Sequence, residues 1–430
     1  MTLTIQRPKA FDLTRLLTRL RHSSPSGIDR VDLAYAHAIL DGPGESVGVV
    51  STVLGPRVLP REEARAVVAT VEAGWVEDRP AEQDPTFQRL AARLGSPLTG
   101  ERVTHSPPPS SARNRRLIQA RTAARILARS RPIAALPRDS LYLHTSHLRL
   151  DIPGRFDWLY DRRDVRAAFF VHDVIPISHP EYGRDGEAAR HETRMRTVGR
   201  HAAAILVNSQ DTGRRTLGLL EAWGFPRPPV AVGHLGVEPA FAREGLRLAP
   251  PRPVFLACGT IESRKNHLLL FQLWRELAER HGASTPILVV VGRRGWEAES
   301  AIDMLERCPG VKAHVVEASG LSTHGLAALM RSCTALLMPS FTEGYGIPVV
   351  EAAASGLPVV ASDIPAHREI AEGLALFRHP LDGPGWLAAI EALSESGSPQ
   401  RADLASRLDG YRPPDWAGHF AAVGPTLAAL

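Results

Sequence analysis

Two glutamates, Glu343 and Glu351, stand on either side of a glycine-rich turn with seven residues between them. The turn, residues 344–347, follows an apolar run that ends at Met338 and precedes Pro348, which suits the first turn of a helix. The first N–H groups of such a helix form a site for an anion such as phosphate. Because carboxylates repel an anion, the glutamates are better suited to accept hydrogen bonds from neutral hydroxyls of the same ligand. A phosphate between two polyols indicates a nucleotide sugar, with one carboxylate for the hexose and one for the ribose.

The residues around this turn predict a strand, a turn, a helix and a second strand. Apolar runs at 334–338 and 357–361 are typical of buried strands. Residues 349–355 continue the helix that Pro348 begins, and Gly356 suits the position just past its end. In the alternative interpretation, both glutamates are solvated charges at the ends of the helix.

Two adjacent cations, Arg264 and Lys265, form a second candidate for phosphate binding. They lie between a predicted strand at 254–258 and a predicted helix at 268–281. There they can neutralise a diphosphate leaving group as its charge develops. The alternative is an exposed basic turn. The sequence contains no Asp-x-Asp, so we expect no metal site and no cofactor besides the nucleotide-sugar donor.

Polar residues also follow predicted strands in the N-terminal half of the chain. His172 and Asp173 come directly after an apolar strand at 167–171, and His147 follows another at 141–144. In parallel α/β sheets, ligands bind beyond the carboxyl ends of the strands. A histidine beside an acid can position an acceptor hydroxyl or stabilise charge at a reacting centre. A histidine at a strand end also commonly has a purely structural role.

Three strings of residues resemble one known family. Residues 339–363, PSFTEGYGIPVVEAAASGLPVVASD, resemble the donor-site motif of glycosyltransferase family 4, which are retaining enzymes. HDVIP at 172–176 resembles the segment that supplies the family's active-site histidine. GTIESRKNH at 259–267 resembles its glycine-to-lysine loop. The resemblance implies an α/β protein with the GT-B fold, in which two Rossmann-like, doubly wound parallel-sheet domains face each other across a cleft.

The same resemblance implies roles for individual residues. Lys265 matches the lysine that binds the donor phosphate, Gly27 matches an N-terminal glycine loop at the cleft, and Ser209 lies in a segment that lines the cleft. Many members carry an arginine where this chain has Thr260, so we expect Arg264 to be the second diphosphate cation. The candidate residues are therefore His172, Glu343, Lys265 and Arg264 for catalysis; Gly27, Thr260, Gly344, Tyr345, Gly346, Ile347 and Glu351 for the donor; and Asp173, His147 and Ser209 for the acceptor.

The length of the chain, 430 residues, is sufficient for two domains that each bury a core. We expect an N-terminal Rossmann-like acceptor domain over residues 1–245 and a donor domain over residues 250–412. A helix at 415–430 is expected to return to the first domain. We predict further strands at 311–316 and at 372–377. Residues 75–110, rich in Pro, Arg and Glu, receive no assignment.

The chain is basic, with a net charge of +5 that comes mostly from arginine. This charge suits phosphate-bearing substrates or an anionic membrane surface, and we find no motif for nucleic-acid binding. Residues 111–131 carry seven arginines and no acidic residue, with Leu117, Ala120, Ala124 and Leu127 on one side of a helical pattern. Such a helix can make peripheral contact with anionic lipid. The alternative is a solvated helix that docks on its own domain.

Three scattered cysteines give neither a disulfide framework nor a metal-binding spacing. No signal peptide is recognisable, and no apolar run reaches the length of about 18 residues needed to cross a bilayer. We therefore expect a cytoplasmic protein that is soluble or peripheral at the inner face of the membrane.

The expected function is retaining transfer of a hexose from a nucleotide sugar to a glycan or lipid-linked saccharide acceptor, in bacterial surface-polysaccharide synthesis. Residues 259–266 and 292–296 resemble bacterial mannosyltransferases, which favours GDP-mannose as the donor. The alternatives are another GT-B enzyme, such as a sugar-nucleotide epimerase or a phosphorylase, and a catalytically silent nucleotide-sugar-binding subunit.

Overall fold

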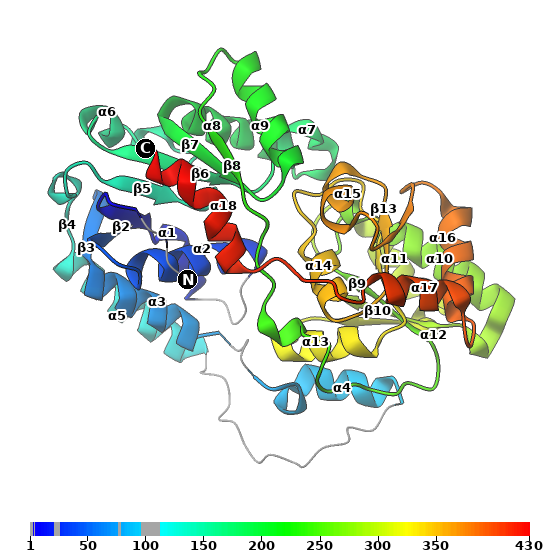
Figure 1. Cartoon of the computed structure of the whole chain (residues 1–430). Coiled ribbons are helices and arrows are strands. Elements are labelled where there is room, and N and C mark those ends of the chain that lie inside the picture. Colours follow the sequence, from blue (N-terminus) through cyan, green and yellow to red (C-terminus); the bar gives the residue numbers. More distant parts are fainter. Residues whose placement is uncertain (1–2, 4, 21–25, 76–78, 96–111) are drawn as a thin grey trace.

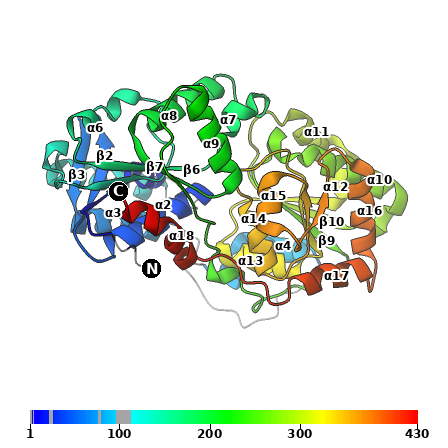
Figure 2. The same ribbon diagram turned by 45° about the horizontal axis from the view of Figure 1, so that its top comes forward.

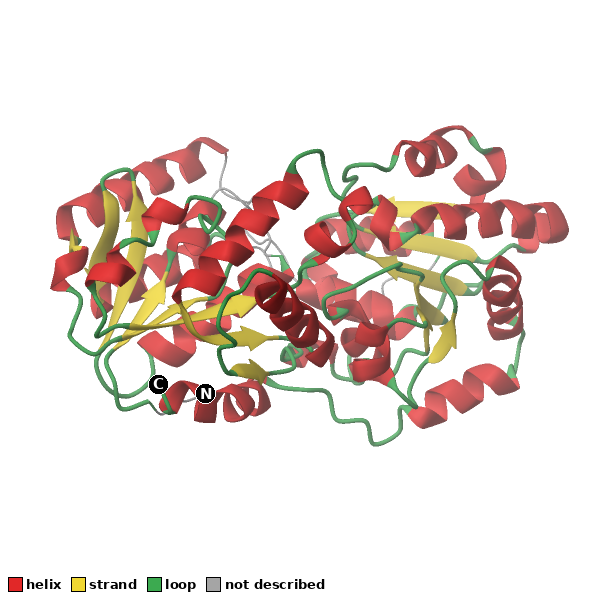
Figure 3. Ribbon diagram, turned by 90° about the horizontal axis from the view of Figure 1, so that it is seen from above, coloured by secondary structure: helices red, strands yellow, loops and turns green. Residues whose placement is uncertain are grey.

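A computed structural model describes residues 3, 5–20, 26–75, 79–95 and 112–430 of the chain (Figure 1). Two α/β lobes lie side by side, each built on its own sheet with helices on both faces (Figure 3). We call the lobe that contains β1 the first lobe and the lobe that contains β9 the second lobe. The sheets are mostly parallel, as predicted, and the fold class is confirmed.

The sheet of the first lobe has the strand order β4-β3-β2-β1-β5-β6-β7-β8. Only its edge departs from the predicted parallel arrangement, because β3 runs antiparallel to both β2 and β4. The strands are β1 (Lys9–Asp12), β2 (Ser46–Thr52), β3 (Gly55–Pro60), β4 (Arg131–Pro132), β5 (Leu141–His144), β6 (Arg166–Val171), β7 (Ala202–Val207) and β8 (Val230–Val232). The helices are α1 (Thr14–Arg19), α2 (Gly27–Leu40), α3 (Arg61–Ala73), α5 (Ala112–Arg129), α6 (Trp158–Asp161), α7 (Ile175–Ser178), α8 (Glu187–His201) and α9 (Gln210–Ala222).

The sheet of the second lobe is parallel throughout, in the order β11-β10-β9-β12-β13-β14. Its strands are β9 (Val254–Cys258), β10 (Ile287–Val291), β11 (Val315–Ala318), β12 (Ala335–Met338), β13 (Val359–Ser362) and β14 (Leu376–Arg378). The helices are α10 (His267–His281), α11 (Glu299–Arg307), α12 (Pro309–His314), α13 (Thr323–Ser332), α14 (Ile347–Ala354), α15 (Pro365–Ala371), α16 (Gly383–Ser394) and α17 (Pro399–Arg407). Because β12 pairs with both β9 and β13, the loops after these three strands open at one edge of the sheet.

One strand prediction is wrong over most of its length. Residues 311–314, predicted as strand, are helical in α12, and β11 begins only at Val315. The physical reason is Pro309, which occupies the first turn of α12 and starts a helix that the apolar pattern alone does not indicate. The predicted strand at 372–377 is likewise shorter, because β14 covers only Leu376–Arg378.

The chain passes from the first lobe to the second between β8 and β9, and two further segments join the lobes. The last helix, α18 (Trp416–Ala428), packs against β7 and β8 of the first lobe, although it follows α17 of the second (Figure 2). In the other direction, the short helix η1 (Ala81–Gln83) and α4 (Pro85–Arg93) pack against α13 of the second lobe (Figure 1). Phe87 is completely buried there. These residues belong to the stretch 75–110, which received no assignment in the sequence analysis.

The carboxylate of Asp84 links the start of α4 to the start of α13. Asp84 accepts hydrogen bonds from Thr86 N at 2.8 Å and from Ser322 N at 2.6 Å. It therefore satisfies free N–H groups at the start of both α4 and α13, which stabilises each helix end.

Candidate active site

The predicted donor residues of the second lobe meet around one carboxylate. Lys265 Nζ donates to Glu343 Oε1 at 2.5 Å, and Arg264 Nη1 donates to Glu343 Oε2 at 2.7 Å. Ser340 Oγ donates to the same Oε1 at 2.7 Å. Burial by itself would raise the pKa of Glu343, but Arg264 and Lys265 outweigh burial and hold the pKa well below its usual range. Glu343 is therefore a buried, ionised hydrogen-bond acceptor.

Arg264 is held by a second carboxylate as well. Its Nη2 donates to Glu262 Oε1 at 2.6 Å, and its Nη1 also donates to the carbonyl of Thr342 at 2.8 Å. Lys265, in contrast, forms an ion pair with Glu343 alone among the residues that the structure describes. Arg264 thus fixes the loop before the glycine turn, whereas Lys265 can turn to a phosphate by leaving a single partner. Thr260 lies half-buried beside Gly295, with no hydrogen bond from its side chain among the described residues.

The glycine turn that starts α14 lies directly against the first lobe. A Cβ on Gly344 would stand 2.5 Å from the carbonyl oxygen of His172, so only glycine fits this approach. Ser209 Oγ and Thr212 Oγ1 donate to the Gly344 carbonyl at 2.8 and 3.2 Å. Gly346, with φ of 103°, takes the left-handed conformation as the N-cap of α14. The turn is therefore shaped from both lobes.

Glu351, the second predicted carboxylate, also faces the first lobe. Arg30 Nη1 of α2 donates to Glu351 Oε1 at 2.8 Å. Burial raises the pKa of Glu351, and the charge of Arg30 offsets part of that effect. Close by, a Cβ on Gly27 would lie 2.7 Å from the side chain of Ile347, which places the start of α2 against the start of α14. Tyr345 is buried, and its hydroxyl lies 3.5 Å from the Leu235 carbonyl.

His172 is held in one tautomer. Its Nε2 lies 2.8 Å from the carbonyl oxygen of Thr145, and a carbonyl can only accept, so Nε2 carries the proton. Nδ1 then keeps a lone pair that can accept a hydrogen bond from a hydroxyl. Burial lowers the pKa of His172 to about 4, so the ring is neutral near pH 7. The Thr145 hydroxyl in turn donates to Asp32 Oδ1 at 2.7 Å, which anchors this segment.

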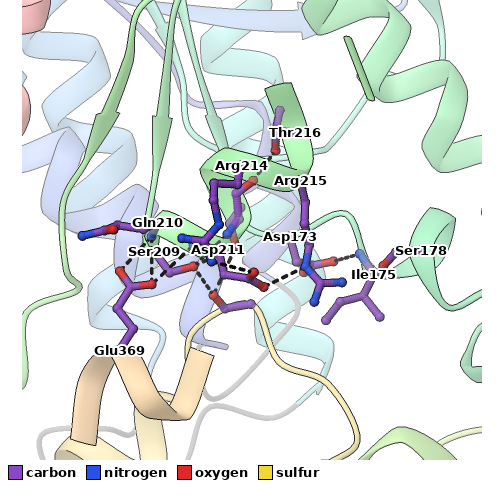
Figure 4. A network of polar contacts seen from close by, with 12 residues as sticks. Asp173, Ile175, Ser178, Ser209, Gln210, Asp211, Arg214, Arg215, Thr216 and Glu369 are labelled. Atoms are coloured by element: carbon purple, nitrogen blue, oxygen red, sulfur yellow. Dashed lines mark hydrogen bonds and ion pairs between the residues drawn. The ribbon is translucent and has the colours of Figure 1, made fainter. Parts of the chain in front are cut away.

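The candidate acceptor residues have partners inside the first lobe. His147 Nε2 accepts from the backbone N–H of His172 at 3.3 Å, and burial lowers the pKa of His147 well below its usual value. Asp173 Oδ1 accepts from Ile175 N at 3.1 Å (Figure 4). Ser209 accepts from Thr212 N at 3.1 Å as the N-cap of α9, besides its bond to Gly344.

Three residues at this interface escaped the sequence prediction: Arg30, Thr212 and Glu369. Glu369 of α15 reaches the start of α9, where it accepts from Gln210 N at 2.7 Å and from Asp211 N at 3.3 Å (Figure 4). His234 Nε2 lies 3.1 Å from the same carboxylate. A carboxylate at a helix N-terminus is favourable for the reasons that favour a phosphate there. Only the charge pattern of Glu369 beside Arg368 was visible in the sequence, and it gives no sign of this partner.

Solved structures with the same arrangement of two α/β lobes identify the fold. Anabaena HepE, solved in complex with UDP and glucose, superposes with a TM-score of 0.62 at 14% identity. The superposition covers 99% of this chain and 100% of HepE. Sucrose-phosphate synthase from Thermosynechococcus elongatus superposes with a TM-score of 0.56 at 15% identity, over 98% of each chain. The fold is therefore GT-B.

A known sequence family matches most of the second lobe. Residues 252–396 match the family described as Glycosyl transferases group 1. The serotype-specific mannosyltransferase WbdA of Escherichia coli is 30% identical over 225 residues, which are 48% of this chain and 27% of WbdA. The O-antigen chain mannosyltransferase B of Escherichia coli is 32% identical over 227 residues, 50% of this chain and 58% of that protein. The chain thus spans about a quarter of WbdA and under two thirds of the other relative.

Proposed function

We propose that this protein is a retaining glycosyltransferase that moves a hexose from a nucleoside diphosphate to a hydroxyl of a saccharide acceptor. The observation that carries the proposal is the position of Glu343, held by Lys265 and Arg264 at the turn that begins α14. Glu351 lies further along α14, and its carboxylate faces the first lobe, where Arg30 donates to it. The site therefore offers a cation, the backbone N–H groups of residues 344–347 and two carboxylates in the order that a nucleotide sugar requires.

Binding of the donor follows from these contacts. The diphosphate takes Lys265 and the backbone N–H groups of residues 344–347, which releases Glu343 to accept hydrogen bonds from the hexose. The ribose takes Glu351, so the Arg30–Glu351 ion pair must part or rearrange. His172 Nδ1 can accept a hydrogen bond from a sugar hydroxyl at the reacting centre. The contacts between the lobes exclude water, which limits hydrolysis of the donor.

Mannose from GDP-mannose is the donor that we propose first. The names of the relatives support mannose, since WbdA, RfbU of Salmonella typhimurium and the O-antigen chain mannosyltransferase B are all named mannosyltransferases. We propose a glycan or lipid-linked saccharide of a bacterial surface polysaccharide as the acceptor. A thermal-shift array of sugar nucleotides, followed by product analysis with a labelled donor, tests this. Stabilisation by GDP-mannose and an α-linked product are expected. Donor binding without transfer to any acceptor in a wide panel would instead support a catalytically silent subunit.

Transfer is expected to continue in excess EDTA. Lys265 and the N-terminus of α14 offer positive charge to the diphosphate, a task that a divalent ion performs in metal-dependent enzymes. The initial rate of transfer, measured with and without the chelator, checks this expectation. A loss of activity that Mg²⁺ or Mn²⁺ restores would show that a metal takes part.

Replacing Glu351 by glutamine is expected to weaken binding of the donor about 10- to 100-fold, the usual effect of losing a hydrogen bond to a charged group. Calorimetric titration with GDP-mannose and with GDP measures the change. Arg30→Gln is the matched variant, because it removes the other half of the same ion pair and leaves the carboxylate for the ribose. Donor affinity at the wild-type value in Glu351→Gln would contradict the ribose role.

We also propose that α5 contacts an anionic membrane surface at the inner face of the membrane. The two leucines that the sequence analysis placed on the apolar side, Leu117 and Leu127, are 48% and 49% exposed, so this side is not docked on the first lobe. Thr122 and Ile126 are the buried positions of the helix among those whose side chains are described. No helix among the described residues is long and apolar enough to cross a bilayer.

Replacing Arg116, Arg121 and Arg129 by glutamine is expected to reduce binding to anionic liposomes by about fivefold for each charge, since each contributes about 1 kcal/mol near such a surface. Co-sedimentation with phosphatidylglycerol vesicles measures the effect, and neutral phosphatidylcholine vesicles are the control. Undiminished sedimentation of the triple variant would rule out this contact.

A further inference from the structure

The charges of the proposed donor site cancel each other. Arg264 and Lys265 are paired with Glu262 and Glu343, and the cation that the first lobe contributes, Arg30, is paired with Glu351. A diphosphate adds at least two negative charges to this buried, balanced set. Since uncompensated charge is costly away from water, its binding favours uptake of a proton by a nearby group.

His367 of α15 is a titratable group placed to take this proton. Its side chain is completely buried, and Nδ1 lies 3.0 Å from the carbonyl oxygen of Ser362, so Nδ1 carries the proton of the neutral ring. Among the described residues Nε2 has no hydrogen-bond partner. The ring lies against the glycine turn, because a Cβ on Gly346 would be 3.2 Å from Cδ2 and 3.5 Å from Nε2. A buried lone pair therefore lies at the start of α14.

The groups around His367 determine its charge. Burial lowers its pKa, the carboxylate of Glu343 raises it, and Lys265 and Arg264 lower it. On its own helix, Arg368 turns to Asp363 and Glu372, and Glu369 turns to α9. These effects together favour the neutral ring. A diphosphate on the turn adds negative charge and draws Lys265 to itself, and both changes favour protonation of Nε2.

We propose that His367 binds a proton at Nε2 when a diphosphate occupies the turn, and so supplies a positive charge beyond the paired cations Arg264, Lys265 and Arg30. The proton comes from solvent, and the resulting imidazolium donates from Nε2 to the turn or to a phosphate oxygen. The inference rests on the proposed function, because it requires a nucleoside diphosphate at this turn.

A second buried histidine serves as an internal control. His267, the first residue of α10, has an Nδ1 without a hydrogen-bond partner among the described residues. Burial and the charge of Lys265 lower the pKa of His267 to about 3. Its ring packs against Phe271 at a centroid distance of 6.2 Å. It shares burial and the neighbouring lysine with His367 but has no contact with the glycine turn.

Calorimetric titration with GDP and with UDP at pH 7.5, in buffers of different ionisation enthalpy, measures the protons taken up on binding. About one proton per nucleotide is expected for the wild type, with affinity falling up to about tenfold per pH unit between the pKa of the free state and the higher pKa of the bound state. His367→Gln is expected to bind with little uptake and little dependence on pH. His267→Gln is expected to behave like the wild type. Thermal unfolding confirms that each variant is folded.

Nucleotide binding by the wild type without proton uptake would overturn the inference and leave the proposed function standing. Uptake that persists in His367→Gln, or disappears in His267→Gln alone, would overturn it as well. The pH dependence of the wild type is sufficient for the first outcome, so the test holds even if a variant fails to fold. Absence of any binding of GDP or UDP would overturn the proposed function itself.

Discussion

Replacement of Lys265 by alanine is expected to lower kcat/KM for hexose transfer by about 30- to 1000-fold, which corresponds to about 2–4 kcal/mol of transition-state stabilisation. The reason is the developing charge of the nucleoside diphosphate as the bond to the hexose breaks. Lys265 reaches the site from the loop after β9, and within the described part of the chain Glu343 is its single ion-pair partner. A phosphate can therefore take the place of Glu343, because Lys265 has to leave a single ion-pair partner.

The loss should fall mainly on kcat, because the leaving group carries more charge in the transition state than in the bound donor. Steady-state kinetics with GDP-mannose gives both parameters. Lys312→Ala is the matched control, since this lysine is exposed on α12. Equal kinetic constants for Lys265→Ala and the control would remove Lys265 from the mechanism.

The second large effect is expected for Glu343→Gln, which should destabilise the protein by about 3–5 kcal/mol, as when one partner of a buried ion pair is removed. The carboxylate lies between Arg264 and Lys265, both largely buried, and the neutral amide leaves Lys265 without compensation and Arg264 with Glu262 alone. Transfer should be lost as well, because the amide cannot replace a carboxylate that accepts several hydrogen bonds from the hexose.

Urea unfolding of the second lobe, followed by intrinsic fluorescence, measures the change in stability. Glu279→Gln is a suitable control, because Glu279 forms an exposed pair with Arg275 on α10, and such pairs contribute about 0.5 kcal/mol or less. A destabilisation no larger than that of the control would show that the buried pairs of Glu343 contribute nothing net.

The same carboxylate gives a dependence on pH with a definite sign. The folded-state pKa of Glu343 lies well below its usual value, so the contribution of Glu343 to stability is present above the unfolded pKa of about 4.3 and is lost as the pH falls below it. The stability difference between the wild type and Glu343→Gln should therefore be largest near neutral pH and shrink in acid. A difference that does not change with pH would contradict this account.

The local signals of the sequence were sufficient for the fold and for the centre of the candidate site. The two carboxylates, the glycines and Pro348 lie close together in the chain, and each type of residue has a physical reason to stand where it does. Gly346 takes the left-handed conformation, and Pro348 lies in the first turn of α14. The strands that carry the site were predicted within one or two residues for β9 and β12.

The contacts between the lobes could not be predicted, because their partners are far apart in the chain. Arg30 and Glu351 are separated by 321 positions, Glu369 and Gln210 by 159, and Ser322 and Asp84 by 238. No periodicity or motif indicates which of the many arginines and acids meet across such distances. The placement of α4 on the second lobe escaped prediction for the same reason, since the face that it buries against α13 has no local partner.

A crystal structure of the protein with bound GDP tests the central claim most directly. We predict that the diphosphate lies within hydrogen-bond distance of Lys265 Nζ and of the backbone N–H groups of residues 344–347, with the ribose hydroxyls on Glu351 and the Lys265–Glu343 pair opened. A nucleotide bound away from residues 343–351, or bound while Lys265 remains on Glu343 and Arg30 on Glu351, would contradict the account.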